Sequence, residues 1–164
     1  MKVKILISMM AVLLLSVPAI AAKEMGSLDA PVLESVGLRS GYVVLDWNDV
    51  NDATKYSVDI EGTVTYYDSN SMTRVTVDVE LSFGTSDRTD GGEMGDSYLA
   101  IPESDLCDAV LDALAEMGVN LDFVGDFQLL SSGKVKALDP GKGKGRQNNP
   151  FSNSMDLPDI ICRR

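Results

Sequence analysis

Five oxygen-bearing side chains crowd into a seven-residue stretch and could ligate a cation: Asp46, Asn48, Asp49, Asn51 and Asp52. Carboxylate and amide oxygens at alternate positions are what a calcium loop supplies. When Asp49 is taken as the first residue of such a loop, however, the third ligand position holds Ala53, which has no side-chain oxygen. The glycine position holds Thr54, and the last position, which needs a glutamate, holds Ile60. Because Asp and Asn side chains also hydrogen-bond their own backbone in turns, we expect a structural corner here.

A second acidic group lies in the glycine-rich stretch 84–96, where acids recur every three residues at Asp87, Asp90, Glu93 and Asp96. The spacing is similar to a GGxGxD calcium repeat, but Met94 stands where that repeat needs glycine, and there is only one copy. Stacked turns of this kind need several copies to bury a core. We expect a solvated acidic loop and no metal, with these four residues as the weak candidates if a metal binds.

The acidic residues also dominate the middle of the chain. From Thr89 to Gly133 there are ten Asp or Glu residues and no Lys or Arg. This segment could dock a basic partner or divalent cations. We favour the alternative, which is the solvated face of an acidic protein.

The stretch "GKGKGRQNN" (141–149) carries cationic and amide side chains in an otherwise acidic chain: Lys142, Lys144, Arg146 and Asn148. It lacks the spacing of a phosphate-binding P-loop, and no helix pattern follows to supply a dipole. Polar loops on a rigid scaffold are a common place for recognition. We therefore take these four residues as the candidate binding residues, the alternative being an ordinary surface loop.

Catalysis has little support in the sequence. The chain has no histidine, which removes the commonest general base and metal ligand. A carboxylate pair could still act in glycoside hydrolysis, but no pair is singled out by its surroundings. No nucleophile-elbow or zinc motif is present. We therefore predict a protein that is not an enzyme and has no cofactor.

The first 22 residues resemble a secretory signal peptide: Lys2 and Lys4 precede an apolar run from Ile5 to Val17 and a small-residue end, "PAIAA". An uncleaved anchor is the alternative. Cleavage leaves 12 basic and 25 acidic residues, a net charge of −13. Such a chain is repelled by nucleic acid and by anionic membranes, so we expect a secreted or periplasmic protein with neither as partner and no membrane insertion after cleavage.

Two cysteines remain, Cys107 and Cys162. In an oxidising compartment they can form a disulfide. Two buried free thiols are the alternative, and we expect the disulfide.

Alternation of polar and apolar residues predicts strands at 31–38, 42–47, 55–61, 63–67, 74–83, 97–102, 134–138 and 151–157. Segments 55–67 and 74–83 should form a long antiparallel hairpin. Residues 119–132 are ambiguous. Residues 23–30 and 159–164 are expected to be tails.

One segment, 102–118, has a helical period instead. Its apolar stripe consists of Leu106, Val110, Ala113, Leu114 and Met117, and its acids Asp105, Asp108, Asp112 and Glu116 lie on another face. We expect the Leu106, Val110 and Leu114 stripe to cover a sheet.

The strands and the turns between them suggest an all-β sandwich, and residues 31–158 resemble a fibronectin type III domain, an immunoglobulin-like fold. "PVLESVGL" resembles its first strand, and "VVLDWNDVNDATKYSVDI" its second and third strands with the core tryptophan and tyrosine. "KVKALDPGKGKGRQNNPFSNSMDL" resembles its late strand, loop and last strand. The span exceeds the usual ~100 residues, so the 102–118 helix is an insertion. Ser131 stands where the family usually has a corner tyrosine.

The expected function is that of a non-catalytic extracytoplasmic binding or structural module, which engages an extracellular protein or polysaccharide through its loops. The alternative is a glycan-active protein, either a carbohydrate-binding module or a carboxylate-based hydrolase. Its candidates for sugar stacking are Tyr66, Tyr67 and Tyr98.

Overall fold

The computed structural model describes residues 28–53, 55–84, 90–91, 96–138 and 149–164. Its elements in chain order are strands β1 (Leu33–Arg39), β2 (Tyr42–Asn48), β3 (Lys55–Asp68), β4 (Thr73–Gly84), β5 (Asp90–Gly91) and β6 (Asp96–Pro102), helix α1 (Glu103–Glu116), the 3-10 turn η2 (Leu121–Phe123), and strands β7 (Val124–Leu138), β8 (Met155–Asp156) and β9 (Ile160–Cys162).

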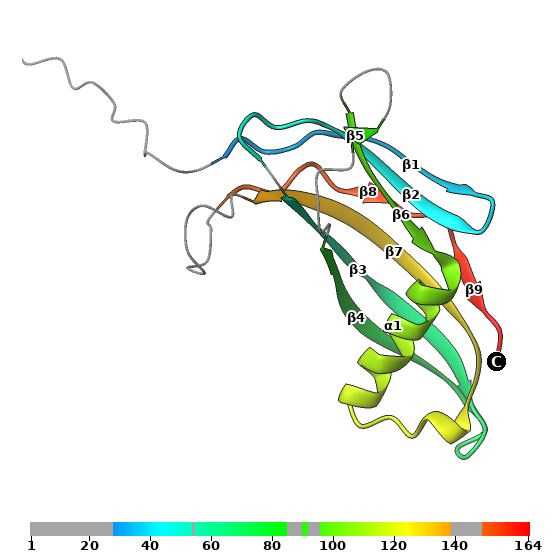
Figure 1. Cartoon of the computed structure of the whole chain (residues 1–164). Helices are drawn as coiled ribbons and strands as arrows, with labels where there is room; N and C mark the ends of the chain where they lie inside the picture. The colour runs from blue at the N-terminus through cyan, green and yellow to red at the C-terminus, as the bar shows by residue number, and fades with distance from the viewer. Residues whose placement is uncertain (1–27, 54, 85–89, 92–95, 139–148) are drawn as a thin grey trace, which may run out of the picture.

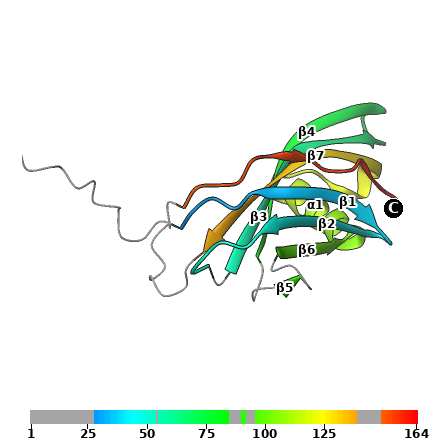
Figure 2. The same cartoon turned by 90° about the horizontal axis from the view of Figure 1, so that it is seen from above.

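These strands form two antiparallel sheets in a sandwich-like arrangement with one helix. The short sheet has the order β1-β2-β6-β5, and the long sheet has the order β4-β3-β7-β8, with β9 also paired to β7. The short sheet covers one part of the long sheet, and α1 crosses the other part (Figure 1). Seen from above, the two sheets form separate layers (Figure 2). The predicted all-β architecture with a single helix is confirmed at this level.

The core lies between the two layers. Trp47 on β2 is fully buried, and its ring meets that of Tyr56 on β3 edge to face, with 5.2 Å between centroids. Such edge-to-face pairs stabilise a core beyond the area that they bury. The expectation that Trp47 is a core anchor is therefore confirmed.

The central hairpin is confirmed and is longer than the sequence pattern indicated. β3 runs without a break through Gly62, and its register with β4 continues from Ser57↔Gly84 to Asp68↔Thr73. The ambiguous residues 119–132 and the predicted strand 134–138 belong largely to one strand, β7, which spans 15 residues. β7 pairs with β3 along almost its whole length, so the two strands form the middle of the long sheet.

Helix α1 occupies the predicted segment. Its buried side chains are Leu106, Val110 and Leu114, as the stripe indicated. Met117 was wrongly included, because the helix ends at Glu116 and Met117 is 50% exposed as its C-cap. Gly118 follows with φ +82°, and its N–H and that of the next residue bond back to the last turn, which closes the helix.

The C-terminal residues are not a tail, so that prediction was wrong. The final segment runs antiparallel to β7, first as β8 and then as β9. Arg164 donates from its backbone N–H to the Asp126 carboxylate at 2.9 Å and from its guanidinium to the Val124 carbonyl at 3.0 Å. The short length of β9 hid it from a pattern search, because three residues show no period.

Cys107 and Cys162 form a disulfide, with 5.8 Å between their Cα atoms. The bond joins the second turn of α1 to β9, so it ties the helix to the edge of the sheet that it covers. No helix in the described ranges has the length and apolar character needed to cross a membrane.

We predict that Gly62→Ala destabilises the fold by about 1–3 kcal/mol, the range for overpacking. A Cβ at Gly62 meets the Leu130 carbonyl oxygen and the Ser131 Cβ well inside van der Waals contact, so β7 has to shift. Gly37→Ala on β1 is the matched control, because nothing lies within 4 Å of its Cβ position. Urea unfolding of the two variants measures the difference, and equal stabilities contradict the close approach.

We also predict that removing the disulfide lowers the free energy of unfolding by about 4 kcal/mol, from the chain entropy of its loop. The bond closes a sequence separation of 55 residues. Urea unfolding of the native protein with and without reductant measures the loss. The control is the Cys107→Ala/Cys162→Ala variant, whose stability should not respond to reductant, and an unchanged native midpoint under reduction argues against the prediction.

Candidate binding face on the long sheet

One face of the long sheet is turned to solvent. Side chains alternate across a strand, so the neighbours of the buried β3 residues point away from the core. On β3 these outward side chains are Lys55, Ser57, Asp59, Glu61, Thr63, Thr65 and Tyr67, and each is exposed or half-buried. The opposing outward positions of β4 and β7 are mostly polar too, so this face can offer hydrogen bonds to a ligand.

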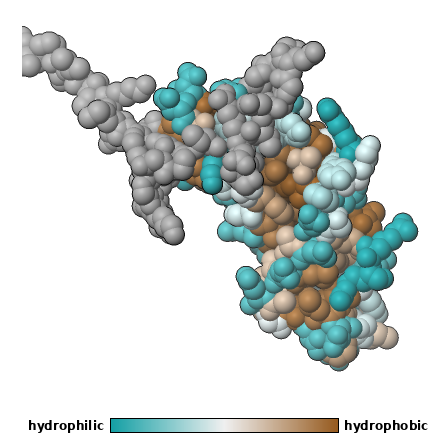
Figure 3. Space-filling model, in the orientation of Figure 1, coloured by the Kyte–Doolittle hydropathy of each residue, from teal (hydrophilic) through white to brown (hydrophobic). Residues whose placement is uncertain are grey.

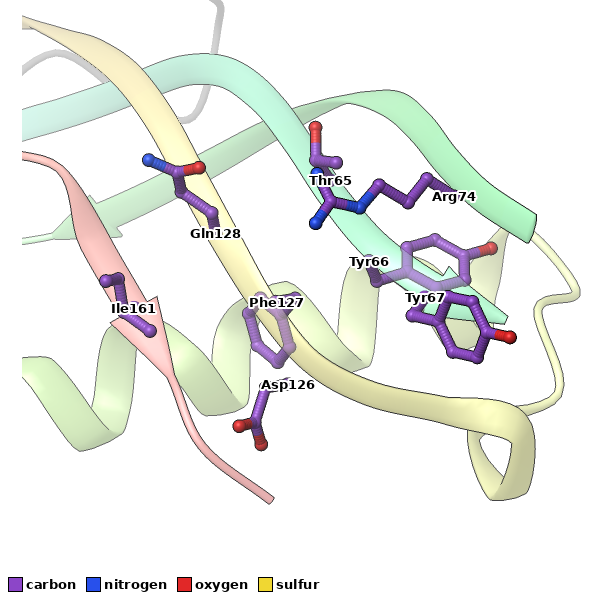
Figure 4. Close-up of a pocket in the computed structure, with 8 residues that line it drawn as sticks. All are labelled: Thr65, Tyr66, Tyr67, Arg74, Asp126, Phe127, Gln128 and Ile161. Atoms are coloured by element: carbon purple, nitrogen blue, oxygen red, sulfur yellow. The ribbon is translucent and has the colours of Figure 1, made fainter. Parts of the chain in front are cut away.

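A hollow of about 290 Å³ lies on this face at the end nearest the β3–β4 turn (Figure 4). It is lined by Thr65, Tyr66, Tyr67, Arg74, Asp126, Phe127, Gln128 and Ile161. These residues come from β3, β4, β7 and β9, so the β3–β4 hairpin and two later strands build one site. Its size is at the lower end for small-molecule sites.

An irregularity in the sheet shapes the hollow. The register between β3 and β7 slips by one residue between Tyr66↔Phe127 and Asp68↔Val124, so Gly125 and Asp126 face Tyr67 together. A β-bulge of this kind turns side chains out of the regular ladder and is common beside binding sites. The ring of Tyr67 is 44% exposed, and its hydroxyl donates to the Met72 sulfur at 3.4 Å. The ring is therefore held in place while much of it remains open to solvent.

Planar polar groups surround that ring. Arg74 lies opposite Tyr67 in the β3–β4 register, and its side chain extends across β3 toward Thr65 (Figure 4). Among the described residues, the Arg74 guanidinium has no ion pair or hydrogen bond. Gln128 makes one long contact of 3.5 Å to Asp159, and the Asp126 carboxylate accepts the Arg164 N–H. The hollow thus has an aromatic surface, a free cation and an amide.

A second group lies on the same face toward the other end of β7. The ammonium groups of Lys134 and Lys136 lie 4.9 and 5.1 Å from the centre of the Phe151 ring. Lys134 also pairs with Glu61. Because these cations are already engaged by a ring and a carboxylate, we regard this group as a brace for the last segment of the chain.

The residues first considered for calcium form a corner, as expected. The Asn48 amide oxygen accepts the backbone N–H of Val32, and the Asp49 carboxylate accepts the Ser97 hydroxyl. The Val50 N–H donates to the Tyr56 hydroxyl at 3.0 Å, and Asp52 has the positive φ of a tight turn, +67°. The side-chain oxygens of Asn48 and Asp49 therefore hydrogen-bond other parts of the chain.

The predicted loop residues lie largely outside the described part of the structure. Lys142, Lys144, Arg146 and Asn148 fall in 139–148, and Asp87 and Glu93 fall in 85–89 and 92–95. Asp90 and Asp96 belong to β5 and β6 by their backbone, but their side chains are not described. The base of the cationic loop is described: Asn149 is 4% exposed, donates to the Ala137 carbonyl at 2.8 Å and accepts the Leu28 N–H at 3.1 Å.

The helix acids Asp105, Asp108, Asp112 and Glu116 are all exposed. Over the ranges that the structure describes, no three Asp, Glu, Cys or His side chains lie close enough to hold a metal ion. The helix acids therefore lie on the solvent side of α1, and whether they serve as a docking face stays a prediction.

Of the residues that line the hollow, the sequence correctly indicated one exposed aromatic ring. Tyr67 was a stacking candidate, but its neighbour Tyr66 is 6% exposed and was wrongly placed with it. Strand alternation already forbids two adjacent residues from sharing a face. Arg74, Asp126 and Gln128 were missed because only the β3–β4 and β3–β7 registers bring them together.

Comparison with protein-family models and with curated proteins finds no match to this chain.

The β3–β4 turn beside the hollow is held by Asp68. Its carboxylate accepts the Ser71 hydroxyl at 2.8 Å, the Asn70 N–H at 2.8 Å and the Ser71 N–H at 3.3 Å. These bonds, first of all that from the Ser71 side chain, lower the pKa of Asp68 below its usual value. Burial, and then the charge of Asp68, raise the pKa of Tyr66. A carboxylate with a lowered pKa stabilises the fold above the usual carboxyl pKa, and this contribution is lost as the pH falls through the lowered value.

We predict that Ser71→Ala raises the pKa of Asp68 back toward its ordinary value, because the variant loses the hydrogen bond that favours the charged form most. NMR titration of the carboxyl carbon measures this directly. Ser69→Ala is the matched control, since that hydroxyl donates to the Phe123 carbonyl instead. An Asp68 pKa that is the same in both variants contradicts the assignment.

Proposed function

We propose that this chain is a non-catalytic binding module that works outside the cytoplasm and holds a polysaccharide on the solvent face of the long sheet. The observation that carries the proposal is the hollow around Tyr67, where an exposed ring held at a bulge stands among Arg74, Gln128 and Asp126. An aromatic face suits the apolar side of a sugar ring, and planar polar groups suit its hydroxyls. The signal-like residues 1–22 and the disulfide support the location.

We also propose that the scaffold is related to the fibronectin type III domain. Strands β1, β2 and β6 belong to one sheet, and β3, β7 and β8 belong to the other. Immunoglobulin-like sandwiches divide their strands in this way, through Greek-key connections. The Trp47–Tyr56 pair across the second and third strands supports the same assignment. In this chain α1 and η2 stand between β6 and β7, which is where the sequence placed an insertion.

An open face supports a binding role for the site. The hollow is built on the solvent face of a sheet, where an extended polymer can lie across several strands. The Asp68 carboxylate nearby has a lowered pKa, which suits a structural anion and not a general acid. The cationic loop at 142–148 remains a second candidate surface, for a protein partner, because polar loops on a rigid scaffold often carry recognition.

The test is a glycan array probed with the mature protein and three variants. Tyr67→Ala should reduce glycan binding at least tenfold, since stacking and ring burial are lost. Tyr42→Ala is the matched control, because that ring is 45% exposed but lies on the short sheet. The third variant, Lys142→Ala/Lys144→Ala/Arg146→Ala, should keep glycan binding.

Each other outcome changes the assignment. Glycan binding that survives Tyr67→Ala and disappears in the loop variant moves the site to residues 142–146. Absence of glycan binding with capture of a protein partner that depends on the loop supports protein recognition instead. Turnover of any bound glycan overturns the non-catalytic assignment.

A further inference from the structure

The outer edge of β4 offers a surface for a second strand. β4 pairs with β3 alone, in a register that continues through its twelve residues without a bulge. Every second N–H and C=O of such a strand points away from its sheet. Within the described ranges, no backbone group of β4 has a hydrogen bond beyond its pairing with β3. In Figure 1 β4 accordingly lies at the border of the long sheet.

The other sheet borders are shorter or partly covered, so β4 has the longest regular free edge among the described strands. At the border of the short sheet, the two residues of β5 cover only one end of β6, which has seven residues. β8 and β9 cover the far border of β7. On β1, the Asn153 amide oxygen accepts the Leu33 N–H at 2.9 Å, and the Asn153 amide nitrogen donates to the Leu33 carbonyl at 3.1 Å. The register of β1 with β2 then shifts between Leu33 and Ser35. Proteins usually protect edge strands with charged side chains, proline, bulges, inward charges or a cover. β4 has no proline, bulge or inward charge, and its three charged side chains, Arg74, Asp78 and Glu80, all lie on the outer face.

The side chains of β4 are complementary to those of a second β4. In an antiparallel pair of β4 strands centred on Val77, Arg74 of each copy lies opposite Glu80 of the other copy. The contact therefore contains two such pairs of opposite charge. Thr76 lies opposite Asp78 on the same face, while Val75 meets Val79 on the inner face. Opposite charges and β-branched pairs across strands each stabilise a sheet. A register centred on Val79 is disfavoured, because it sets Asp78 against Glu80.

The burial along β4 points to the same centre. Val79 and Leu81 are already buried within one copy, at 4% and 6% exposed. Val75 and Val77 are only half-buried, although they face the core side. On α1, Ala109 and Ala113 are also half-buried, on the flank turned away from Cys107. Figure 3 views this side and shows apolar surface between hydrophilic rows below the grey segments. A second copy whose β4 pairs at Val77 would cover the apolar surface around Val75 and Val77 that one copy leaves half-buried.

We propose that β4 is a self-association edge, and that two copies of this chain join their long sheets through antiparallel β4 strands about a twofold axis. An isologous contact of this kind closes at two copies. The joined sheet carries both Tyr67 hollows on the same face, and Glu80 of the second copy lies beside Arg74 of the first. The inference does not rest on the ligand, because it follows from the backbone edge and from the charges of β4.

The test is sedimentation velocity on the mature, disulfide-bonded protein over a concentration series, with three variants. Arg74→Glu and Glu80→Arg each place like charges opposite one another twice, and each should raise the dimer dissociation constant at least tenfold. The double variant Arg74→Glu/Glu80→Arg restores opposite charges and should recover the native value. Glu80 also lies opposite Glu61 within one copy, so Glu80→Arg relieves a repulsion and does not threaten the fold.

A wild-type protein that stays monomeric at every concentration overturns the proposal. So does a dimer whose dissociation constant is unchanged by the single variants, or is not recovered by the double variant. A series of species larger than the dimer also overturns it, since that requires a contact that does not close. Glycan binding by a monomer leaves the function standing while this inference fails, so the two are distinguished.

Discussion

The pairing of β3 with β7 is the constraint on which the rest of this structure depends. The two strands have 14 and 15 residues, whereas β2 and β6 of the short sheet have 7 each. At about 3.3 Å per residue, the short sheet can cover only half of the inner face. Helix α1, which follows β6 directly, covers the remainder with Leu106, Val110 and Leu114. The disulfide to β9 then fixes the helix across the sheet.

Two glycines allow the layers and strands to approach as closely as they do. Gly62 sits where β3 and β7 come too near for any side chain, and Gly133 leaves room for Leu45 of the short sheet and for Leu157. Close packing of this kind is sensitive to single methyl groups. The same pairing creates the outer face, because it fixes which residues of β3, β4 and β7 point to solvent. A bulge at its end exposes the Tyr67 ring.

The acidic residues illustrate how tertiary context assigns a role. The side chains of Asn48 and Asp49 accept hydrogen bonds from other parts of the chain at a corner between the sheets, and Asp52 has the positive φ of the turn there. Asp68 has a similar role in the β3–β4 turn, and its lowered pKa reflects the donors around it. The helix acids remain in solvent. These carboxylates therefore have two different settings in the described part of the chain, some bonded within turns and others exposed on a helix.

Local periodicity was sufficient to predict the β3–β4 hairpin, the core role of Trp47, the α1 stripe and the acidic corner, because each depends on residues close in the chain. The extent of β7, the strand at Ile160 and the exposure of Met117 depended on tertiary partners, and the sequence pattern misjudged them. The hollow was largely hidden for the same reason. Tyr67, Arg74, Asp126 and Ile161 are brought together only by strand registers, and a register between distant segments leaves no local pattern in a sequence.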